Sequence, residues 1–329
     1  MTDENSPADD AALRQAMHRV RTEVDKAVVG QAGTVTGLLV SLLARGHVLL
    51  EGVPGVAKTL VVRSFARALG LDTKRVQFTP DLMPGDVTGS IVYDARTGEF
   101  DFRAGPVFTH ILLADEINRT PPKTQAALLE AMEERQVSAD GVSRALPDPF
   151  LVAATQNPIE HEGTYSLPEA QLDRFMFSLQ LDYPGKDDEM EIVRRTTLKE
   201  LPTLTPSVSV DDILAAQRLV LAVPVSEHVL DYAVELASAT RPARQGAAQV
   251  SRDYVEWGAG PRASQYLILG AKALALLDGR VTPETADVRA VAHAVLQHRV
   301  ITNYRATGAG KKSKDVLDAL LKTVKEREY

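Results

Sequence analysis

Hydrophobic and polar positions divide the chain into two regions with different periodicity. In the first region, short apolar runs alternate with segments of helical spacing, a pattern typical of strands joined by helices. The strand candidates are residues 47–50, 75–79, 110–114, 150–155 and 175–181. After Tyr183-Pro184-Gly185 the strand signals largely vanish and helical spacing dominates. We therefore expect a disordered acidic tail over residues 1–10, an α/β domain over residues 11–184 and a helical domain over residues 185–329.

Two further segments of the first region have the pattern of a β-hairpin. One lies near residues 90–103 and turns at Ala95-Arg96-Thr97-Gly98, and the other lies near residues 136–146 and turns at Ala139-Asp140-Gly141. Two extended runs separated by a short turn that contains glycine are a typical hairpin signal. The first hairpin could be a moving part beside a functional site, or a surface feature without a role in it.

The first strand candidate leads into the glycine-rich turn GVPGVAKT at residues 52–59, and a helical segment follows it. A strand, a glycine-rich turn and a Lys-Thr pair at a helix start are typical of a loop that binds nucleotide phosphates. The backbone N–H groups can point inward, and the helix N-terminus adds partial positive charge. Lys58 can neutralise the β- and γ-phosphates, and the Thr59 hydroxyl can ligate Mg²⁺. An ordinary strand-to-helix turn with a chance lysine is the alternative.

Ala57 is the one departure from the usual form of this loop, because it stands where the last glycine is normally found. Alanine adds only a methyl group and can sit in the first helical turn, so we expect nucleotide binding to persist. The expected contacts to the nucleotide come from Gly52, Val53, Pro54, Gly55, Val56, Ala57, Lys58, Thr59 and Leu60.

A second apolar run, residues 110–114, ends in the adjacent carboxylates Asp115 and Glu116. Side chains alternate along a strand, so the two carboxylates diverge at its tip. Asp115 can hold the Mg²⁺ shell through water, and Glu116 can orient and polarise a water for in-line attack on the γ-phosphate. Two solvated turn residues are the alternative, which the strand placement disfavours.

Two polar residues farther along the chain are candidates for the same site. Asn157 follows the strand candidate 150–155 and could position the attacking water, although an Asn-Pro turn is common. Arg174 precedes the last strand candidate, from where it cannot easily reach the phosphate of its own chain. It could serve a neighbouring subunit, where such arginines stabilise transition-state charge, or form a local salt bridge to Asp173 or Glu169.

Two glycine-containing turns could also contact the nucleotide. Val29-Gly30 lie in a tight turn between two helices, where main-chain groups could hold an adenine ring; for the turn alone, a plain helix-breaking glycine is the favoured interpretation. Arg262 follows Gly258-Ala259-Gly260-Pro261 at the start of a helix in the second region. It could touch ATP and sense its loss, although a lone arginine there would be unremarkable.

Composition limits the classes of function. The net charge of −7 argues against a protein that mainly coats nucleic acid. The chain has no cysteine, which excludes disulfides, zinc fingers and thiolate chemistry. Its N-terminus is polar rather than a secretory signal, and the longest apolar stretch, near residues 38–43, is too short to span a bilayer. We therefore expect a cytoplasmic enzyme without membrane insertion.

The ordered motifs resemble the AAA+ ATPases and, within them, the MoxR family. The resemblance covers about residues 25–305 and rests on VVGQ at 28–31, GVPGVAKT at 52–59, LLADEINR at 112–119, ATQNP at 154–158, LPEAQLDRF at 167–175 and GPRA at 260–263. Ala57 fits this family's version of the loop, whereas Gly260 stands where the family usually has serine. The resemblance implies a P-loop αβα core with a parallel sheet, a helical lid and a ring, expected to be a hexamer.

The resemblance also implies roles for the candidate residues. Lys58 and Thr59 would bind ATP·Mg²⁺, Asp115 and Glu116 would be the hydrolytic acids, Asn157 the first sensor, Arg174 a finger acting in trans and Arg262 the second sensor. Proteins of this kind assemble, activate or remodel other proteins, often with von Willebrand factor A domain partners. A DNA-directed motor and a nucleotide-gated scaffold that does not hydrolyse ATP remain alternatives. The acidic balance disfavours the first, and the complete set of Glu116, Asn157 and Arg174 disfavours the second.

Overall fold

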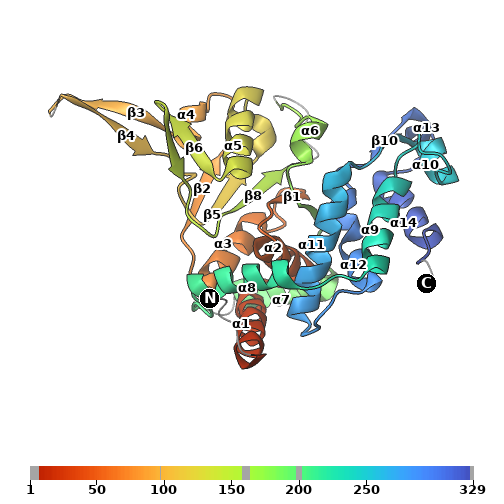
Figure 1. The fold of residues 1–329 in the computed structure, drawn as a ribbon. Helices are drawn as coiled ribbons and strands as arrows, with labels where there is room; N and C mark the ends of the chain where they lie inside the picture. Colours follow the sequence, from red (N-terminus) through yellow and green to blue (C-terminus); the bar gives the residue numbers. More distant parts are fainter. Residues whose placement is uncertain (1–6, 97, 158–163, 198–201, 327–329) are drawn as a thin grey trace.

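The computed structural model describes residues 7–96, 98–157, 164–197 and 202–326 (Figure 1). Five parallel strands form its central sheet in the order β2-β5-β8-β1-β9. These strands are β1 (Val48–Gly52), β2 (Thr73–Gln77), β5 (Ile111–Asp115), β8 (Leu151–Gln156) and β9 (Phe177–Leu181). The expectation of an α/β core with a parallel sheet is confirmed.

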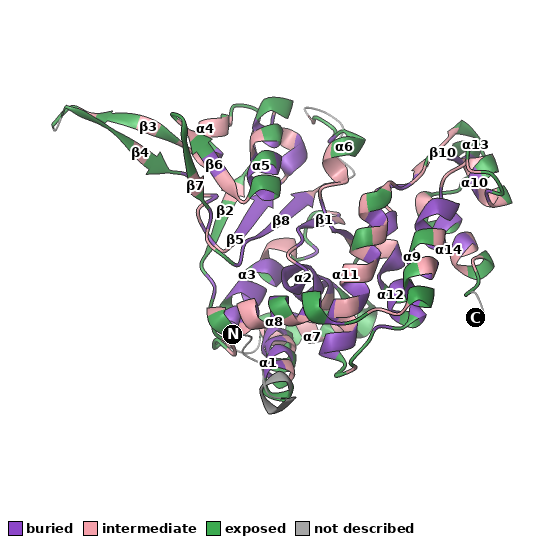
Figure 2. Ribbon diagram, in the orientation of Figure 1, coloured by how far each residue is buried: buried purple, intermediate pink, exposed green. Residues whose placement is uncertain are grey.

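Four strands of the sheet, β1, β5, β8 and β9, are largely buried, whereas the edge strand β2 is mostly exposed (Figure 2). In the buried strands the alternation of side chains assigns each residue to one face. Val48 and Leu50 belong to one hydrophobic cluster, and Leu49 between them belongs to another. This is the period of two that a strand imposes on its side chains. Parallel strands covered on both faces are nearly continuously apolar, which is why short apolar runs revealed them in the sequence.

Helices cover both faces of the sheet. One face packs against α2 (Ala32–Leu43) and α3 (Lys58–Leu69), and the other packs against α5 (Pro122–Glu134). The remaining helical elements of this region are α1 (Pro7–Asp25), α4 (Pro84–Thr88), the 3-10 turn η1 (Ile117–Arg119) and α6 (Glu169–Leu172). Residues 7–10, which we expected in a disordered tail, begin α1 instead, and residues 1–6 lie outside the described residues.

Two antiparallel β-hairpins are inserted in the α/β region. The first pairs β3 (Gly89–Asp94) with β4 (Glu99–Ala104), and the second pairs β6 (Gln136–Ala139) with β7 (Val142–Ala145). The first hairpin projects away from the body of the molecule (Figure 1). Near its tip the exposed rings of Tyr93 and Phe100 pack against each other with centroids 5.1 Å apart.

The second region is helical, with one addition that the sequence did not reveal. Its helices are α7 (Lys186–Thr197), α8 (Val210–Ala222), α9 (Glu227–Ala239), α10 (Gln249–Tyr254), α11 (Pro261–Leu277), α12 (Thr285–Leu296), α13 (Tyr304–Gly308) and α14 (Ser313–Thr323). The addition is a two-stranded antiparallel sheet of β10 (Val255–Trp257) and β11 (Ile301–Thr302). Strands of this length are too short to produce an alternation that can be recognised in a sequence.

Helices α9, α11 and α12 share a hydrophobic cluster with α2, α3 and one face of the sheet. The helical region is therefore packed onto the α/β core rather than tethered to it. Among the described residues, no single helix has the length and apolar composition needed to cross a membrane; α8 and α9 meet that test only as a pair, with a bend of 93° between them.

The His47 side chain hydrogen-bonds to β8 and to α5 at the start of β1. Its Nδ1 accepts a hydrogen bond from the Val152 N–H at 3.0 Å, and its Nε2 lies 3.1 Å from the Met132 carbonyl oxygen. A ring nitrogen that accepts from an N–H carries no proton, so the buried imidazole is neutral and donates from Nε2. Burial, together with the positive charge of Arg135, lowers the pKa of His47 to about 3.

The neutral state of His47 should make the protein less stable in mild acid. The unfolded chain binds a proton near pH 6.5, whereas the folded chain binds it only near pH 3. The contribution is therefore complete above pH 6.5 and is lost as the pH falls toward 3. Between pH 7 and pH 5 this group should lower the free energy of unfolding by about 2 kcal/mol, measurable by urea titration.

His47→Gln is the matched control, because an amide keeps one donor and one acceptor but does not titrate in this range. Its loss of stability between the two pH values should be smaller than that of the wild type by about 2 kcal/mol. An equal loss in both proteins would contradict the assignment of the neutral imidazole.

Candidate functional site

The carboxyl ends of the parallel strands meet at one edge of the sheet. The register places Glu51 opposite Gln156, Gly52 opposite Leu181, and Gln77 opposite Asp115. Because β8 lies between β1 and β5, the residues at its end lie between the glycine-rich loop and the acidic pair. Ligands of open parallel sheets bind outside this edge.

The loop after β1 has the backbone that a phosphate cradle requires. At Gly52 an added Cβ would lie 2.5 Å from the Leu181 carbonyl oxygen, so no larger residue fits beside β9. Gly55 has a φ of +88°, a conformation that favours glycine, and the space beside it is open. Val56 is buried and anchors the loop to the core.

Ala57 has a left-handed backbone, with φ of 62° and ψ of 23°, and is the N-cap of α3. The expectation that it sits in the first helical turn is therefore wrong, since the helix begins at Lys58. A left-handed alanine costs about 1–2 kcal/mol relative to the right-handed conformation. The loop thus contains a small amount of backbone strain at the start of α3.

Lys58 extends from the first turn of α3 across the ends of β1 and β8. Its ammonium group donates to the Gly52 carbonyl oxygen and lies 3.5 Å from the Gln156 carbonyl oxygen. Thr59 and the partly exposed Leu60 follow in the same helical turn. The structure therefore brings the loop lysine to the end of the strand that adjoins the acidic pair.

Asp115 is buried at the end of β5 and has a partner on each carboxylate oxygen. The Thr155 hydroxyl donates to Oδ1 at 2.6 Å. Arg75 donates to Oδ2 from both Nε, at 3.0 Å, and Nη2, at 2.7 Å. By strand alternation, Asp115 and Thr155 share the sheet face of Leu113 and Ala153, which is the face that α3 covers.

Glu116 also has a left-handed backbone, with φ of 58° and ψ of 50°, and leads into η1. Its N–H donates to the Thr155 hydroxyl at 2.9 Å. Its carboxylate accepts from Gln77 Nε2 at 2.7 Å and from Arg119 Nη1 at 2.9 Å. The two carboxylates diverge and are held by specific donors, so they are not freely solvated turn residues.

Asn157 and Gly30 lie at the same edge of the sheet. Asn157 is buried directly after β8. Gly30 lines a cavity of about 340 Å³ with Asp182 and Tyr183, which directly follow β9. Gly30 therefore lies beside the segment that leaves β9, the strand next to β1.

Arg174 and Arg262 are not brought to this edge. Met176, two residues after Arg174, donates from its N–H to the carbonyl oxygen of His47, which directly precedes β1 at its amino end. A small cavity at that end is lined by His47, Arg174 and Arg262, among others. The distance along β1 from His47 to Gly52 is about 16 Å. Both arginines therefore lie at the amino ends of the strands, and the glycine-rich loop of their own chain lies at the carboxyl ends.

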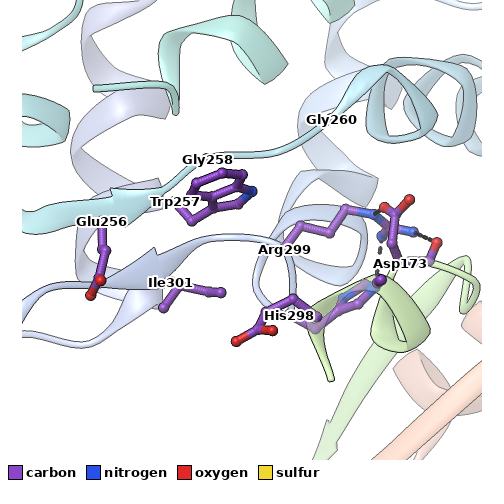
Figure 3. A pocket seen from close by; sticks show the side chains of 10 residues that line it. Asp173, Glu256, Trp257, Gly258, Gly260, His298, Arg299 and Ile301 are labelled. Carbon is purple, nitrogen blue, oxygen red and sulfur yellow. Dashed lines mark hydrogen bonds and ion pairs between the residues drawn. The ribbon is translucent and has the colours of Figure 1, made fainter. Parts of the chain in front are cut away.

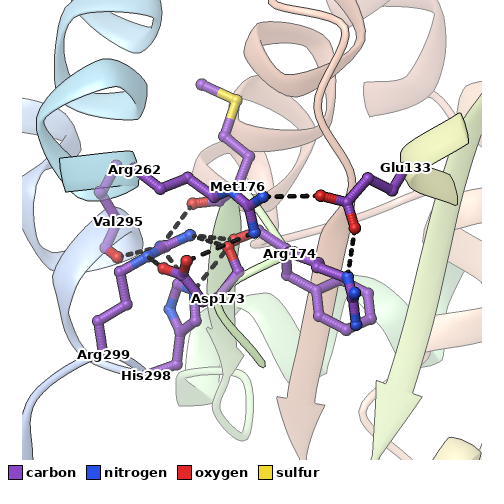
Figure 4. A network of polar contacts seen from close by, with 9 residues as sticks. Glu133, Asp173, Arg174, Met176, Arg262, Val295, His298 and Arg299 are labelled. Carbon is purple, nitrogen blue, oxygen red and sulfur yellow. Dashed lines mark hydrogen bonds and ion pairs between the residues drawn. The ribbon is translucent and has the colours of Figure 1, made fainter. Parts of the chain in front are cut away.

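One carboxylate holds both arginines (Figure 4). Glu133, near the end of α5, accepts from Arg174 Nε at 2.7 Å and from Arg262 Nη2 at 2.8 Å. The hydrogen bond from Arg174 lowers the pKa of Glu133, burial opposes this, and the charge of Arg262 adds to the lowering. The salt bridge of Arg174 is therefore to Glu133 and not to Asp173 or Glu169, the partners that the sequence suggested.

A buried arginine, Arg299, fixes the helical region to the segment before β9. It donates to the Asp173 carboxylate at 2.7 Å and to the carbonyl oxygens of Asp173, Phe175 and Met176 (Figure 4). Burial lowers the pKa of Arg299, while the bond to Asp173 opposes this. Sequence reasoning missed both Glu133 and Arg299. No motif contains either residue.

A cavity of about 610 Å³ lies beside this anchor, between α6 and the β10–β11 sheet (Figure 3). Trp257, His298 and Ile301 line it, together with Asp173 and Arg299. None of its lining residues belongs to the glycine-rich loop or the acidic pair. It is therefore separate from the candidate phosphate site.

The groups at the carboxyl edge fit a nucleotide with Mg²⁺. Mg²⁺ prefers oxygen ligands and is commonly bound through one or two protein groups plus substrate phosphates. The Thr59 hydroxyl and the Asp115 carboxylate are oxygen groups of this kind, although both oxygens of Asp115 are hydrogen-bonded to Thr155 and Arg75 in this structure. Among the described residues there is no cluster of three or more His, Cys, Asp or Glu that could hold a metal ion.

Comparisons with known families agree with this geometry. Residues 47–177 match the family described as "ATPase family associated with various cellular activities (AAA)". Residues 247–320 match the AAA lid domain. The first match spans the central strands from β1 to the start of β9, and the second spans the chain from α10 to within α14.

Several relatives match nearly the whole chain. The chaperone MoxR1 of Mycobacterium tuberculosis is 45% identical over 95% of this chain and 83% of its own length. The uncharacterised protein YeaC of Bacillus subtilis is 44% identical over 95% of both chains, and the protein MoxR of Paracoccus denitrificans is 35% identical over 83% and 85%. The crystal structure of a candidate ATPase from Cytophaga hutchinsonii matches with a TM-score of 0.90 and 41% identity over 97% of both chains.

The strain at Ala57 can be tested by substitution. Ala57→Gly removes the methyl group that disfavours the left-handed backbone, although it also frees the unfolded chain. We expect it to raise the free energy of unfolding by about 0.5–1 kcal/mol. Ala66→Gly, at a right-handed position of the same helix, is the control and should instead destabilise the protein. Denaturant titration of both variants measures the change in the free energy of unfolding. Destabilisation by Ala57→Gly would show that the backbone at Ala57 is not strained.

Proposed function

Because the chain belongs to the MoxR family of AAA+ ATPases, we propose that it binds ATP with Mg²⁺ and hydrolyses it at the carboxyl edge of its sheet. The observation that carries the proposal is the convergence of two motifs on adjacent residues of β8. Lys58 lies at the Gln156 carbonyl oxygen, and the Thr155 hydroxyl binds Asp115. A phosphate-binding lysine and an acidic pair at one sheet edge are the parts that phosphoryl transfer to water requires.

Each residue at this edge then has a defined task. The backbone N–H groups of residues 53–60 bind the phosphates, helped by the N-terminus of α3, and Lys58 neutralises their charge. Thr59 would ligate Mg²⁺ and Asp115 would hold its shell through water, and the bound ion would neutralise charge on the phosphates. Glu116 orients and polarises the attacking water, and Asn157 helps to place that water. The adenine ring is held at the Val29-Gly30 turn.

We propose that Arg174 and Arg262 serve a neighbouring protomer. Both lie at the amino edge of the sheet, about 16 Å along β1 from the phosphate loop of their own chain. An arginine supplied in trans stabilises charge in the transition state of phosphoryl transfer. A closed ring of identical protomers, such as a hexamer, presents this edge of one chain to the carboxyl edge of the next.

The proposed output of hydrolysis is the assembly, activation or remodelling of partner proteins. A relative that carries the name chaperone supports this class of function. A partner with a von Willebrand factor A domain and a cytoplasmic location are further parts of the proposal, and they rest on the resemblance and on composition alone. The net charge of −7 disfavours nucleic acid as the partner.

Glu116→Gln tests the role of the catalytic carboxylate. The amide keeps the shape of the side chain but cannot act as a base, so we expect hydrolysis to fall by about 10²–10⁴-fold while ATP binding persists. Phosphate release and binding of a fluorescent ATP analogue measure the two effects. An unchanged rate would remove Glu116 from this role.

Lys58→Ala is the matched comparison for Glu116→Gln. It removes the charge that faces the β- and γ-phosphates, so binding itself should weaken. Wild-type affinity in this variant would contradict the assignment of the phosphate loop.

Mixing of inactive variants tests the shared site. Arg174→Ala protomers retain the acidic pair, and Glu116→Gln protomers retain both arginines, so neighbours in a mixed ring can form intact sites. We expect phosphate release from the mixture to exceed that of either variant alone. Arg262→Ala mixed with Glu116→Gln should behave in the same way.

A mixture of Lys58→Ala with Glu116→Gln is the control, because both changes damage the carboxyl edge of the chain that carries them. No neighbouring pair in that mixture has an intact site, so no rescue is expected. Absence of rescue in the arginine mixtures, with mixed oligomers present, would show that the arginines act within their own chain.

A further inference from the structure

Thr155 is a buried threonine at the end of β8; it belongs to ATQNP, but Asn157 is the residue of that motif to which a role was assigned. It lies one residue before Gln156 and two before Asn157. Its strand is hydrogen-bonded on both sides, to β1 and to β5. The backbone that carries this hydroxyl therefore has little freedom to move.

The hydroxyl of Thr155 contacts both members of the acidic pair. It lies 2.6 Å from Asp115 Oδ1 and 2.9 Å from the Glu116 backbone nitrogen. An N–H can only donate and an ionised carboxylate can only accept, so the direction of both bonds is fixed. The hydroxyl accepts from Glu116 and donates its proton to Asp115, which makes it a bridge between the two acids.

Each bond constrains a different property of the pair. The bond to Oδ1 sets the rotation of the Asp115 carboxylate and leaves Oδ2 as the oxygen directed toward Arg75. The bond from the Glu116 N–H holds a left-handed backbone that a glutamate adopts rarely. Such strained residues persist where surrounding contacts determine them, and they concentrate at functional sites.

We propose that Thr155 is a positioning residue that orients Asp115 toward Mg²⁺ and Glu116 toward the attacking water. It acts through the two acids and does not itself touch the reacting atoms. The inference rests on the proposed function, because it assigns the geometry of the same hydrolytic site. It gives a role to a motif residue that had none assigned, namely the hydroxyl group at position 155 of ATQNP.

Thr155→Val and Thr155→Ser form the central test. Valine keeps the branched shape but leaves Asp115 Oδ1 and the Glu116 N–H without their partner, whereas serine keeps the hydroxyl. We expect the valine variant to lose about tenfold to a hundredfold in kcat, the size of one lost hydrogen bond to a charged group. It should also need more Mg²⁺ for half-maximal rate, and serine should restore most of both properties.

Binding measurements separate positioning from a loss of fold. With EDTA present, a fluorescent ATP analogue should bind the wild type and Thr155→Val with similar affinity, because the loop and Lys58 are unchanged. Added Mg²⁺ should strengthen binding less in the valine variant than in the wild type. Thr109→Val is the matched control: Thr109 is also buried, and its hydroxyl has no hydrogen-bond partner among the described residues, so we expect wild-type behaviour.

Several results would overturn the inference. One is a valine variant with wild-type kcat and Mg²⁺ dependence; another is a serine variant as impaired as the valine one. If Thr155→Val does not fold, Thr155→Cys takes its place, because a thiol is only a weak donor; a wild-type rate in the cysteine variant would also overturn it. A wild-type protein that releases no phosphate would instead refute the proposed function, and this inference with it.

Discussion

The parallel pairing of β8 with β1 on one side and β5 on the other is the constraint on which the candidate site depends. It brings Gln156 beside the end of β1 and Thr155 beside Asp115, so two motifs far apart in the sequence face one another. A slip of one residue would send the Thr155 side chain to the opposite face of the sheet. Because both faces of β8 are buried, such a slip is strongly disfavoured. The site residues on β8 are therefore held in place by the packing of the core.

The two edges of the sheet differ in the way that their charges are held. At the carboxyl edge, Asp115 and Glu116 are bound by residues of the sheet and of η1. At the amino edge, the buried Arg299 anchors the helical region, whereas Arg174 and Arg262 share the partly exposed Glu133. Breaking a buried ion pair is costly, but partly exposed pairs contribute little to stability. The burial of Arg299 is consistent with a structural role. The weaker ion pairs of Arg174 and Arg262 are easier to exchange for a different partner.

This division is the basis for proposing that the site is shared between neighbouring chains. The lysine, the acids and Asn157 come from segments at the carboxyl edge: parallel chain direction gives them a common edge, and strand order makes them neighbours. Arg174 precedes β9 and Arg262 begins α11, so the fold assigns both to the other edge. Glu133 bridges them and thereby connects the α/β core to the helical region.

Sequence reasoning located the buried strands and selected the candidate site residues where the signal is local. The buried strands have continuous apolar runs, and the phosphate loop and acidic pair are contiguous, so their residues could be selected without knowledge of the fold. It was less accurate at Ala57, whose left-handed backbone depends on how the loop joins α3, and at β10–β11, whose strands are too short to show a period. It also missed Thr155, Glu133 and Arg299, because each matters through a partner distant in the chain.

Contiguous residues are enough to specify the chemical groups that the protein offers: a glycine-rich loop with Lys58 and Thr59, two adjacent carboxylates, and the order of strands and helices that carry them. These features depend on neighbours along the chain. The spacing of apolar residues predicts strands and helices, glycines permit the turn of the loop, and polar residues directly after an apolar run lie at the end of a strand. The tertiary structure alone decided which groups meet. Strand order and register bring Thr155 to both acids and place Arg174 and Arg262 across the sheet, because pairing between distant segments sets these distances and no local pattern records them.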